Sequence, residues 1–239
     1  MENTNSEFDQ WMQTNREARA FALFREGKPI PFGLMSQLIP KALFKDPFIN
    51  FICHYPGGIG FKMRDMYYRG RLKSCGMGVL LDQGVRIDDP ARISIGDYVW
   101  IDRNVNLQAG WGSITIGRRV HVAENVLISG CGHVTIEDYA AVARGVSIYS
   151  HSEAIVNGKR MSGPMIPESQ KGMKTAPIKI GRDAVVSVNA LILPGVTIGE
   201  GAIVGANSMV NRDVKDWDIV FGSPAKPIAK RPKVTVEDC

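Results

Sequence analysis

Aliphatic residues recur at every sixth position through much of this 239-residue chain. A helix repeats every 3.6 residues and an ordinary strand alternates every two, so a period of six fits neither. It fits short strands joined by tight corners, with one aliphatic side chain per strand turned inward. The repeat therefore predicts an all-β chain wound into a parallel β-helix. Fifteen positions in register carry only Ile, Val or Leu: Ile95, Ile101, Leu107, Ile116, Val122, Ile128, Ile136, Val142, Ile148, Ile180, Val186, Ile192, Ile198, Val204 and Val210.

The positions between these aliphatic residues agree with strands and corners. A small or β-branched residue stands four places after the inward residue, and Gly or Asn recurs three places after it. Gly and Asn adopt left-handed backbone angles at the lowest cost, which tight corners require. These corner positions are Asn104, Gly110, Asn125, Gly145, Asn189, Gly195, Gly201 and Asn207. The inward aliphatic residues and the corner residues therefore follow the same six-residue register.

The interruptions of the repeat predict where function lies. Counting Leu81 to Ile87 as the visible end of the first set, the step lengthens after every third hexad. We therefore expect a triangular prism with three hexads per coil, whose insertions all leave one edge. The largest insertion is a loop at about residues 150–177, and loops on a rigid scaffold are where function usually resides.

Two regions flank the repeat, which spans residues 75–222. Residues 1–74 are expected to be a helical capping segment, with one helix from Ser6 to Glu26 and a second from Gly33 to Phe44, ended by Asp46-Pro47. Residues 223–239 are expected to be a C-terminal tail. The N-terminal segment can cap the open end of the prism, which otherwise invites edge pairing. The alternative is a weak association with a membrane surface.

Composition excludes several classes of protein. The net charge is only +5 and is scattered, and no basic stripe is interleaved with aromatic residues, so nucleic acid is not an expected partner. The four cysteines show no paired spacing and are expected to be free thiols. The first twenty residues are polar, and no uncharged apolar run reaches about 18 residues. We therefore expect a soluble, cytoplasmic protein.

Trp111, His133 and His151 fall on the insertion edge of the expected prism. A histidine near neutral pKa beside a long loop suits a general base, so His151 is the catalytic candidate; the alternative is a surface corner residue. His133 either contacts substrate or has a structural role. Trp111 either packs or stacks on a sugar ring. A catalytic metal needs three protein ligands, and no close pair of histidines supplies them, so no metal is expected.

From Ile95 to about Arg231 the chain resembles the left-handed β-helix hexapeptide acyltransferases. The most specific stretch runs from Ile180 to Val210, and Phe221-Gly-Ser-Pro-Ala-Lys-Pro is similar to the closing segment of that family. The resemblance implies a left-handed coil, a homotrimer with sites between subunits, and acetyl-CoA as donor. The basic lead-in that ends at Cys75-Gly76 is similar to O-acetyltransferases of surface polysaccharide biosynthesis.

The resemblance also implies roles for individual residues. His151 matches the catalytic histidine. Val185 stands where the family often has Trp, and Ala123 where related sugar acetyltransferases have a substrate-binding Asn, with Asn125 close by. The expected substrate-binding residues are therefore His133, Trp111 and Asn125. The expected CoA contacts are Ser187, Gly205, Ala206, Asn211, Arg212 and Lys226.

These residues predict an acetyl-CoA-dependent O-acetyltransferase that transfers directly to a sugar or saccharide hydroxyl. Glu153 and Glu168 are both candidates for orienting His151. N-acetylation of a nucleotide-linked amino sugar needs the same base and remains an alternative. A non-catalytic β-helix assembly module and a metal-dependent hydratase on the same scaffold are further alternatives.

Overall fold

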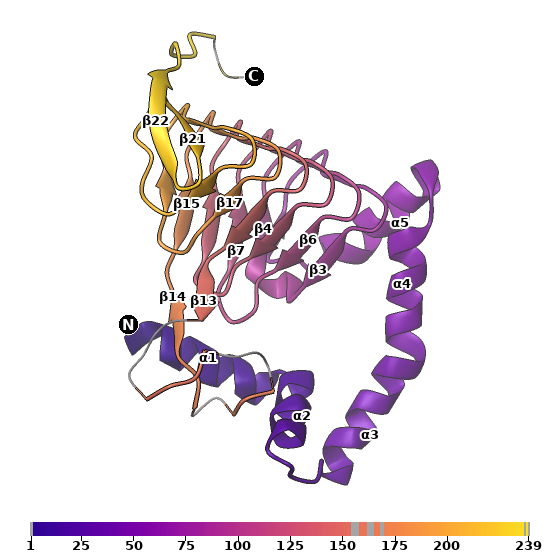
Figure 1. Ribbon diagram of the computed structural model, residues 1–239. Coiled ribbons are helices and arrows are strands. Elements are labelled where there is room, and N and C mark those ends of the chain that lie inside the picture. Colours follow the sequence, from indigo (N-terminus) through magenta and orange to yellow (C-terminus); the bar gives the residue numbers. More distant parts are fainter. Residues whose placement is uncertain (1, 154–157, 162–164, 168–169, 237, 239) are drawn as a thin grey trace.

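Three parallel sheets form the walls of a prism in the computed structural model. A helical arm, residues 32–54, stands beside the prism (Figure 1). The structure describes residues 2–153, 158–161, 165–167, 170–236 and 238. The first sheet contains β1 (Ser74–Cys75), β4 (Ile93–Ile95), β7 (Ile114–Ile116), β10 (Val134–Ile136), β15 (Ile178–Ile180) and β18 (Thr197–Ile198). The second contains β2 (Leu80–Leu81), β5 (Trp100–Ile101), β8 (His121–Val122), β11 (Ala141–Val142), β16 (Val185–Val186), β19 (Ile203–Val204), β21 (Asp218–Gly222) and β22 (Ala225–Lys230). The third contains β3 (Arg86–Asp88), β6 (Asn106–Gln108), β9 (Leu127–Ser129), β12 (Ser147–Tyr149), β17 (Leu191–Ile192) and β20 (Met209–Val210).

The six-residue repeat is confirmed position by position. All fifteen inward aliphatic residues are buried, with at most 2% of their surface exposed. All eight corner Gly and Asn residues have left-handed backbone angles, with φ between 55° at Asn207 and 85° at Gly195. The coils are consistent with the left-handed β-helix that the resemblance implies. The fold class is therefore as expected.

One edge of the prism turns several of its corners without Gly or Asn. Between the first and second sheets, Tyr98, Arg119 and Tyr139 adopt φ of 53° to 60°, whereas Gly201 turns another of these corners. A left-handed angle costs such residues about 1–2 kcal/mol. Stacking offsets part of this, because the Arg119 guanidinium lies 4.8 Å from the centre of the Tyr98 ring in the coil before it.

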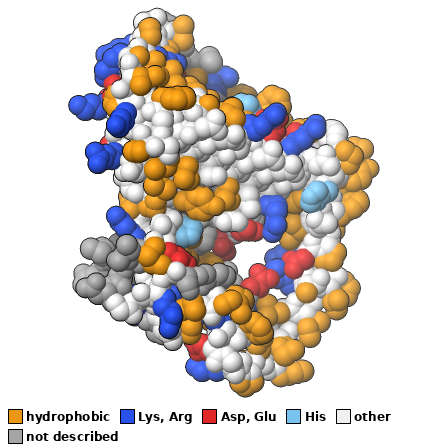
Figure 2. Space-filling view, viewed as in Figure 1, with side chains coloured by type: hydrophobic (Ala, Val, Ile, Leu, Met, Phe, Trp, Pro, Cys, Tyr) orange, Lys and Arg blue, Asp and Glu red, His pale blue; other side chains and the backbone are white. Residues whose placement is uncertain are grey.

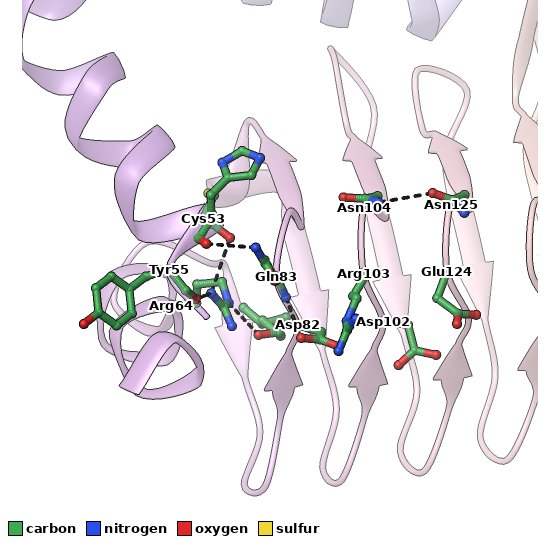
Figure 3. A network of polar contacts seen from close by, with 12 residues as sticks. Cys53, Tyr55, Arg64, Asp82, Gln83, Asp102, Arg103, Asn104, Glu124 and Asn125 are labelled. Atoms are coloured by element: carbon green, nitrogen blue, oxygen red, sulfur yellow. Dashed lines mark hydrogen bonds and ion pairs between the residues drawn. The ribbon is translucent and has the colours of Figure 1, made fainter. Parts of the chain in front are cut away.

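Helices α4 (Asp46–His54) and α5 (Gly57–Arg69) cover the first coil. Cys53, Tyr68 and Leu72 join the core of the prism. Arg64 is fully buried there; its Nε donates to the carbonyl of Leu81 at 2.7 Å and its Nη1 to the carbonyl of Tyr55 at 2.8 Å (Figure 3). The guanidinium thus satisfies carbonyl groups at the end of the coil stack, where an open edge would otherwise be exposed.

The helical boundaries differ from the sequence-based expectation. The expected helix from 6 to 26 is two helices, α1 (Glu2–Thr14) and α2 (Arg16–Arg25), because the Asn15 side chain accepts a hydrogen bond from the backbone of Ala18 and starts a new helix. The expected stop at Asp46-Pro47 is wrong. Helix α3 (Phe32–Pro40) continues through a π-helical turn, η1 (Lys41–Lys45), into α4, where Pro47 lies in the first turn and needs no hydrogen-bond donor.

The C-terminal segment is more ordered than a tail. Strand β22 pairs antiparallel with β21 and closes the last coil. A short helical turn, η2 (Pro90–Arg92), leads into β4. Cys53, Cys75 and Cys131 are free thiols, as expected. Within the described residues, no helix has the length and apolar character to cross a membrane.

Candidate active site

The long insertion leaves and re-enters the prism at two fixed points. Strand β13 (His151–Glu153) pairs antiparallel with β14 (Met173–Thr175), so the ends of the expected loop form a two-stranded ribbon. Ser150 is buried at its base, where its hydroxyl donates to the carbonyl of Ser129 at 2.6 Å and accepts from the amide of Gly132 at 2.8 Å. His151 is therefore the first residue beyond a rigid anchor.

The imidazole of His151 has two aromatic neighbours, with the centre of Trp111 at 6.3 Å and that of Tyr149 at 6.1 Å. Its Nδ1 is 3.2 Å from the hydroxyl of Ser129 in the preceding coil. Burial lowers the pKa of His151, so the ring is neutral at neutral pH. When Nδ1 carries the proton and donates to Ser129, Nε2 is the basic atom. The site thus holds a neutral imidazole with one nitrogen fixed.

His133 lies one coil before His151 on the same edge, with both ring nitrogens engaged. Nδ1 is 2.9 Å from the Ser113 hydroxyl, and Nε2 is 3.2 Å from the carboxylate of Glu7 in α1. Its φ of 68° turns the chain at the corner. These contacts hold the ring in one orientation beside the site.

Helix α1 covers this edge, which the sequence did not indicate (Figure 1). The ring of Phe8 meets Trp111 edge-on at 4.9 Å, and Trp11 meets it at 5.8 Å. The Trp11 indole also donates to the carboxylate of Asp89 at 3.2 Å, two coils before His133. Burial raises the pKa of Asp89, with the charge of Asp88 acting in the same direction. Phe8 and Trp11 were on the apolar face of the expected helix, but their spacing does not say where that face docks.

A cavity of about 1060 Å³ lies beyond Trp11, between the helical arm and the first coil. Its walls include Trp11, Asp88 and Asp89 together with Lys41 and Arg86. Figure 2 shows the corresponding opening, with acidic and basic side chains around it. Trp11 therefore connects the insertion edge with a large cavity lined by charged side chains.

Cys131 shares the edge but is not suited to act as a nucleophile. Burial raises the pKa of its thiol to about 11, so it stays protonated at neutral pH. Glu153 is exposed on β13 and is not the group at His151 Nδ1; Glu168 lies outside the described residues. Ser129 occupies that position, and the coil register, in which Ser129 pairs with Tyr149, was the signal that could have located it.

Asn125 is not beside His151 within this chain. It lies on the edge between the second and third sheets, where Asn104 donates to its side-chain oxygen at 3.4 Å (Figure 3). The structure therefore brings together His151, His133 and Trp111 and leaves Asn125 on another edge.

The expected CoA contacts also divide between edges. Ser187, Gly205 and Ala206 follow β16 and β19 on the Asn125 edge, whereas Asn211 and Arg212 follow β20 on the insertion edge. Lys226 lies on β22, and both it and Arg212 are exposed. Gly205 has a structural reason of its own, because an added Cβ would lie 2.1 Å from the ring of Phe221.

Among the residues that the structure describes, no group of three or more His, Cys, Asp or Glu side chains is placed to hold a metal ion. The chemistry on the edge is therefore that of imidazoles, hydroxyls, carboxylates and aromatic rings.

Comparison with known proteins agrees with this architecture. Residues 177–212 match the family model "Bacterial transferase hexapeptide (six repeats)". The chain is 37% identical over 161 residues to the dTDP-4-amino-4,6-dideoxy-D-glucose acyltransferase of Escherichia coli, covering 65% of this chain and 83% of that protein. It is 28% identical to the putative lipopolysaccharide biosynthesis O-acetyl transferase WbbJ of Escherichia coli K12, covering 80% of this chain and 76% of that protein.

Among solved structures, the chain is similar to a mutant of AntD, an N-acyltransferase from Bacillus cereus, in complex with dTDP-4-amino-4,6-dideoxyglucose and coenzyme A. The TM-score is 0.66 at 30% identity, covering 71% of this chain and 89% of that one. The identity and coverage of these matches settle the family. The chain belongs to the hexapeptide-repeat acyltransferases.

Proposed function

We propose that this acyltransferase is an acetyl-CoA-dependent O-acetyltransferase acting on a sugar or saccharide hydroxyl. The observation that carries the proposal is the neutral, half-buried imidazole of His151, fixed by Ser129 and set beside Trp111. An aromatic ring suits the apolar face of a sugar, and a neutral imidazole suits removal of a hydroxyl proton. Phe8 and Trp11 extend the aromatic wall.

In the proposed reaction, Nε2 of His151 accepts the proton of the acceptor hydroxyl as its oxygen attacks the thioester carbonyl. The tetrahedral intermediate then collapses, the carbon–sulfur bond breaks, and the CoA thiolate takes the proton from the imidazolium. A backbone amide beside the donor stabilises the oxyanion. No covalent acyl-enzyme is needed, which agrees with the protonated thiol of Cys131.

We further propose a homotrimer with its sites between subunits. The expected CoA contacts lie on two edges of one prism, so a groove between neighbouring copies would bring one edge from each together. The AntD structure holds coenzyme A together with a nucleotide-linked sugar, and WbbJ is named as an O-acetyl transferase of lipopolysaccharide biosynthesis, which supports a CoA donor and a sugar acceptor. In the same proposal, the N-terminal segment associates with a membrane surface and the enzyme is cytoplasmic.

Transfer to the amine of a nucleotide-linked amino sugar is the second candidate. The 37% identical relative carries a name of that kind. An amine acceptor must also lose a proton as the amide forms, so a base at His151 would serve this reaction too. The nature of the product therefore decides between the two candidates.

An acceptor screen tests the proposal. Release of free thiol from acetyl-CoA is measured with a panel of hydroxyl-bearing saccharides and nucleotide-linked amino sugars, and each product is then treated with mild alkali. We expect an alkali-labile acetyl ester on a saccharide. An alkali-stable amide product would establish the second candidate instead, and thiol release that no acceptor stimulates would contradict both.

A further inference from the structure

The outer face of the helical arm carries a continuous stripe of large apolar side chains that touch solvent. These six residues, the arm stripe, are exposed by 45% to 84%: Phe32, Met35, Ile39, Leu43, Phe44 and Phe51. They come from α3, η1 and α4, which run without interruption from Phe32 to His54. Figure 2 shows hydrophobic side chains gathered over this part of the molecule. A soluble surface seldom exposes so many large apolar residues in one row.

The face of the arm toward the prism and the face that carries the stripe have different side chains. Lys41, Ile49 and Cys53 line the cavity that faces the prism, and none of the arm stripe does. Phe44 alone of the stripe borders a second hollow, between the arm and residues 14–17. The π-helical turn contributes to this division, because its extra residue rotates α4 relative to α3 and keeps the apolar positions on one side. The stripe is therefore built as a face, and the prism does not cover it.

Positive charge is concentrated in the same part of the chain. Residues 16–69 contain nine Lys and Arg against four Asp and Glu, a net charge of +5. The preceding fifteen residues carry a net charge of −3. Lys28 and Lys62, beyond either end of the stripe, keep 62% and 72% of their side chains exposed although each forms an ion pair, with Glu26 and Asp65. Of the nine basic residues, Arg64 is buried, so the four acidic residues leave an excess of four positive charges outside the core. An apolar face with basic residues around it matches an interfacial helix on an anionic bilayer.

We propose that the arm stripe docks the enzyme on the surface of an anionic lipid bilayer, with the helix lying in the interface. The consequence for substrate rests on the proposed function: the acceptor is a saccharide carried on a lipid. Helix α1, whose Trp11 forms part of the site wall, is joined to the arm through α2. Docking therefore holds the insertion edge, where we place the acceptor, near the lipid headgroups.

A bilayer fits the stripe better than a second copy of the chain. The stripe is a single convex helix face, and a flat fluid interface accepts it without a matching groove. The excess of positive charge favours anionic lipid, whereas two identical arms packed together would repel each other. Self-association through the stripe is the outcome against which the test is set.

Vesicle co-sedimentation of the full-length chain tests the docking. The probes are vesicles of phosphatidylcholine alone and vesicles containing phosphatidylglycerol. We expect binding to the anionic vesicles that weakens with salt. The double variant Leu43→Glu, Phe44→Glu should bind roughly tenfold less or weaker still, because burial of two large apolar side chains is lost. The matched control is Val236→Glu, which changes a 79% exposed apolar residue in the C-terminal segment and should bind like the wild type.

Two results would overturn the proposal: no binding of the wild type to anionic vesicles, or equal binding by the stripe variant. In the first case, a change of oligomeric state in the stripe variant, measured by light scattering, would identify a second copy as the occupant. Circular dichroism verifies that both variants are folded. Thiol release with a free saccharide should be unaffected by the stripe variant, and His151→Ala should still bind vesicles. A wild-type enzyme that turns over but binds no anionic vesicles would reject the inference alone. A wild-type enzyme that docks but does not turn over would reject the proposed function alone.

Discussion

The two edges that flank the third sheet are made from the same six-residue repeat, yet they have different chemistry. The edge with Asn104, Asn125, Gly145 and Asn189 keeps a strict six-residue spacing, and every one of these residues has a left-handed backbone angle. The insertion edge carries extra residues in coil after coil, together with Trp111, His133 and His151. The regular edge keeps the coils in register, and this leaves the other edge free to carry insertions and reactive side chains.

The largest expected effect separates a histidine on the insertion edge from one elsewhere. His151→Ala should lower kcat by about 10²–10⁴-fold, because the general base is removed. His121→Ala is the control, since His121 is half exposed on the second sheet and paired with Asp102. It should change kcat by less than about twofold, as expected for a surface substitution. Steady-state thiol release measures both, and full turnover by the His151 variant would refute the mechanism.

The pH dependence of the wild-type enzyme should report the half-buried imidazole of His151. Because burial lowers the pKa of His151, the ring remains neutral and basic below the pH at which an ordinary histidine is protonated. The acid limb of kcat/KM should therefore have a midpoint below about 6.5 and fall about tenfold per pH unit beneath it. A midpoint above that value would contradict the burial of this residue.

Substitutions in α1, which lies over the insertion edge, should have a smaller effect, and this effect should fall on acceptor binding. Trp11→Ala should raise the KM for the acceptor by about tenfold, the equivalent of about 1–1.5 kcal/mol of aromatic contact, and leave the KM for acetyl-CoA unchanged. Phe24→Ala, an exposed aromatic residue of α2, is the matched control. An equal effect of both substitutions on both substrates would mean that α1 acts through folding alone.

Substitution of the charged residues expected to contact CoA should have a weaker effect, because these side chains are exposed. Arg212→Gln and Lys226→Gln should each raise the KM for acetyl-CoA by about threefold to tenfold, and added salt should reduce the difference. Arg144→Gln, which removes a surface charge paired with Glu124, serves as control. If salt changes the wild type and both variants alike, these charges do not meet the phosphates.

The smallest effect concerns the regular edge. Asn125→Ala should destabilise the protein by about 1 kcal/mol, because alanine tolerates a φ of 60° poorly, while Asn125→Gly should be close to neutral. Urea denaturation measures both. A raised acceptor KM in the glycine variant would show that a neighbouring copy brings this edge to the site.

The core of this fold was readable from the sequence because each inward position depends on local spacing. Ile95 to Val210 needed only the six-residue count. The corners at Tyr98 and Tyr139 were not readable, because stacking with arginines of neighbouring coils supports angles that their residue type does not suggest. His151, His133 and Trp111 were found through the interruptions of the repeat. Ser129 and Trp11 were not, since their roles depend on contacts across coils and with a distant helix.

The ribbon of β13 and β14 has a consequence for how such an enzyme can change. Its two strands meet directly outside the prism, so the position of His151 is set before the rest of the insertion begins. The chain between the two strands can then change in length or sequence while both of its ends stay fixed beside the base. The prism and the ribbon keep the base in place, while the segment beyond the ribbon can be exchanged. Evolution or protein engineering can therefore change the acceptor without changing the catalytic residue.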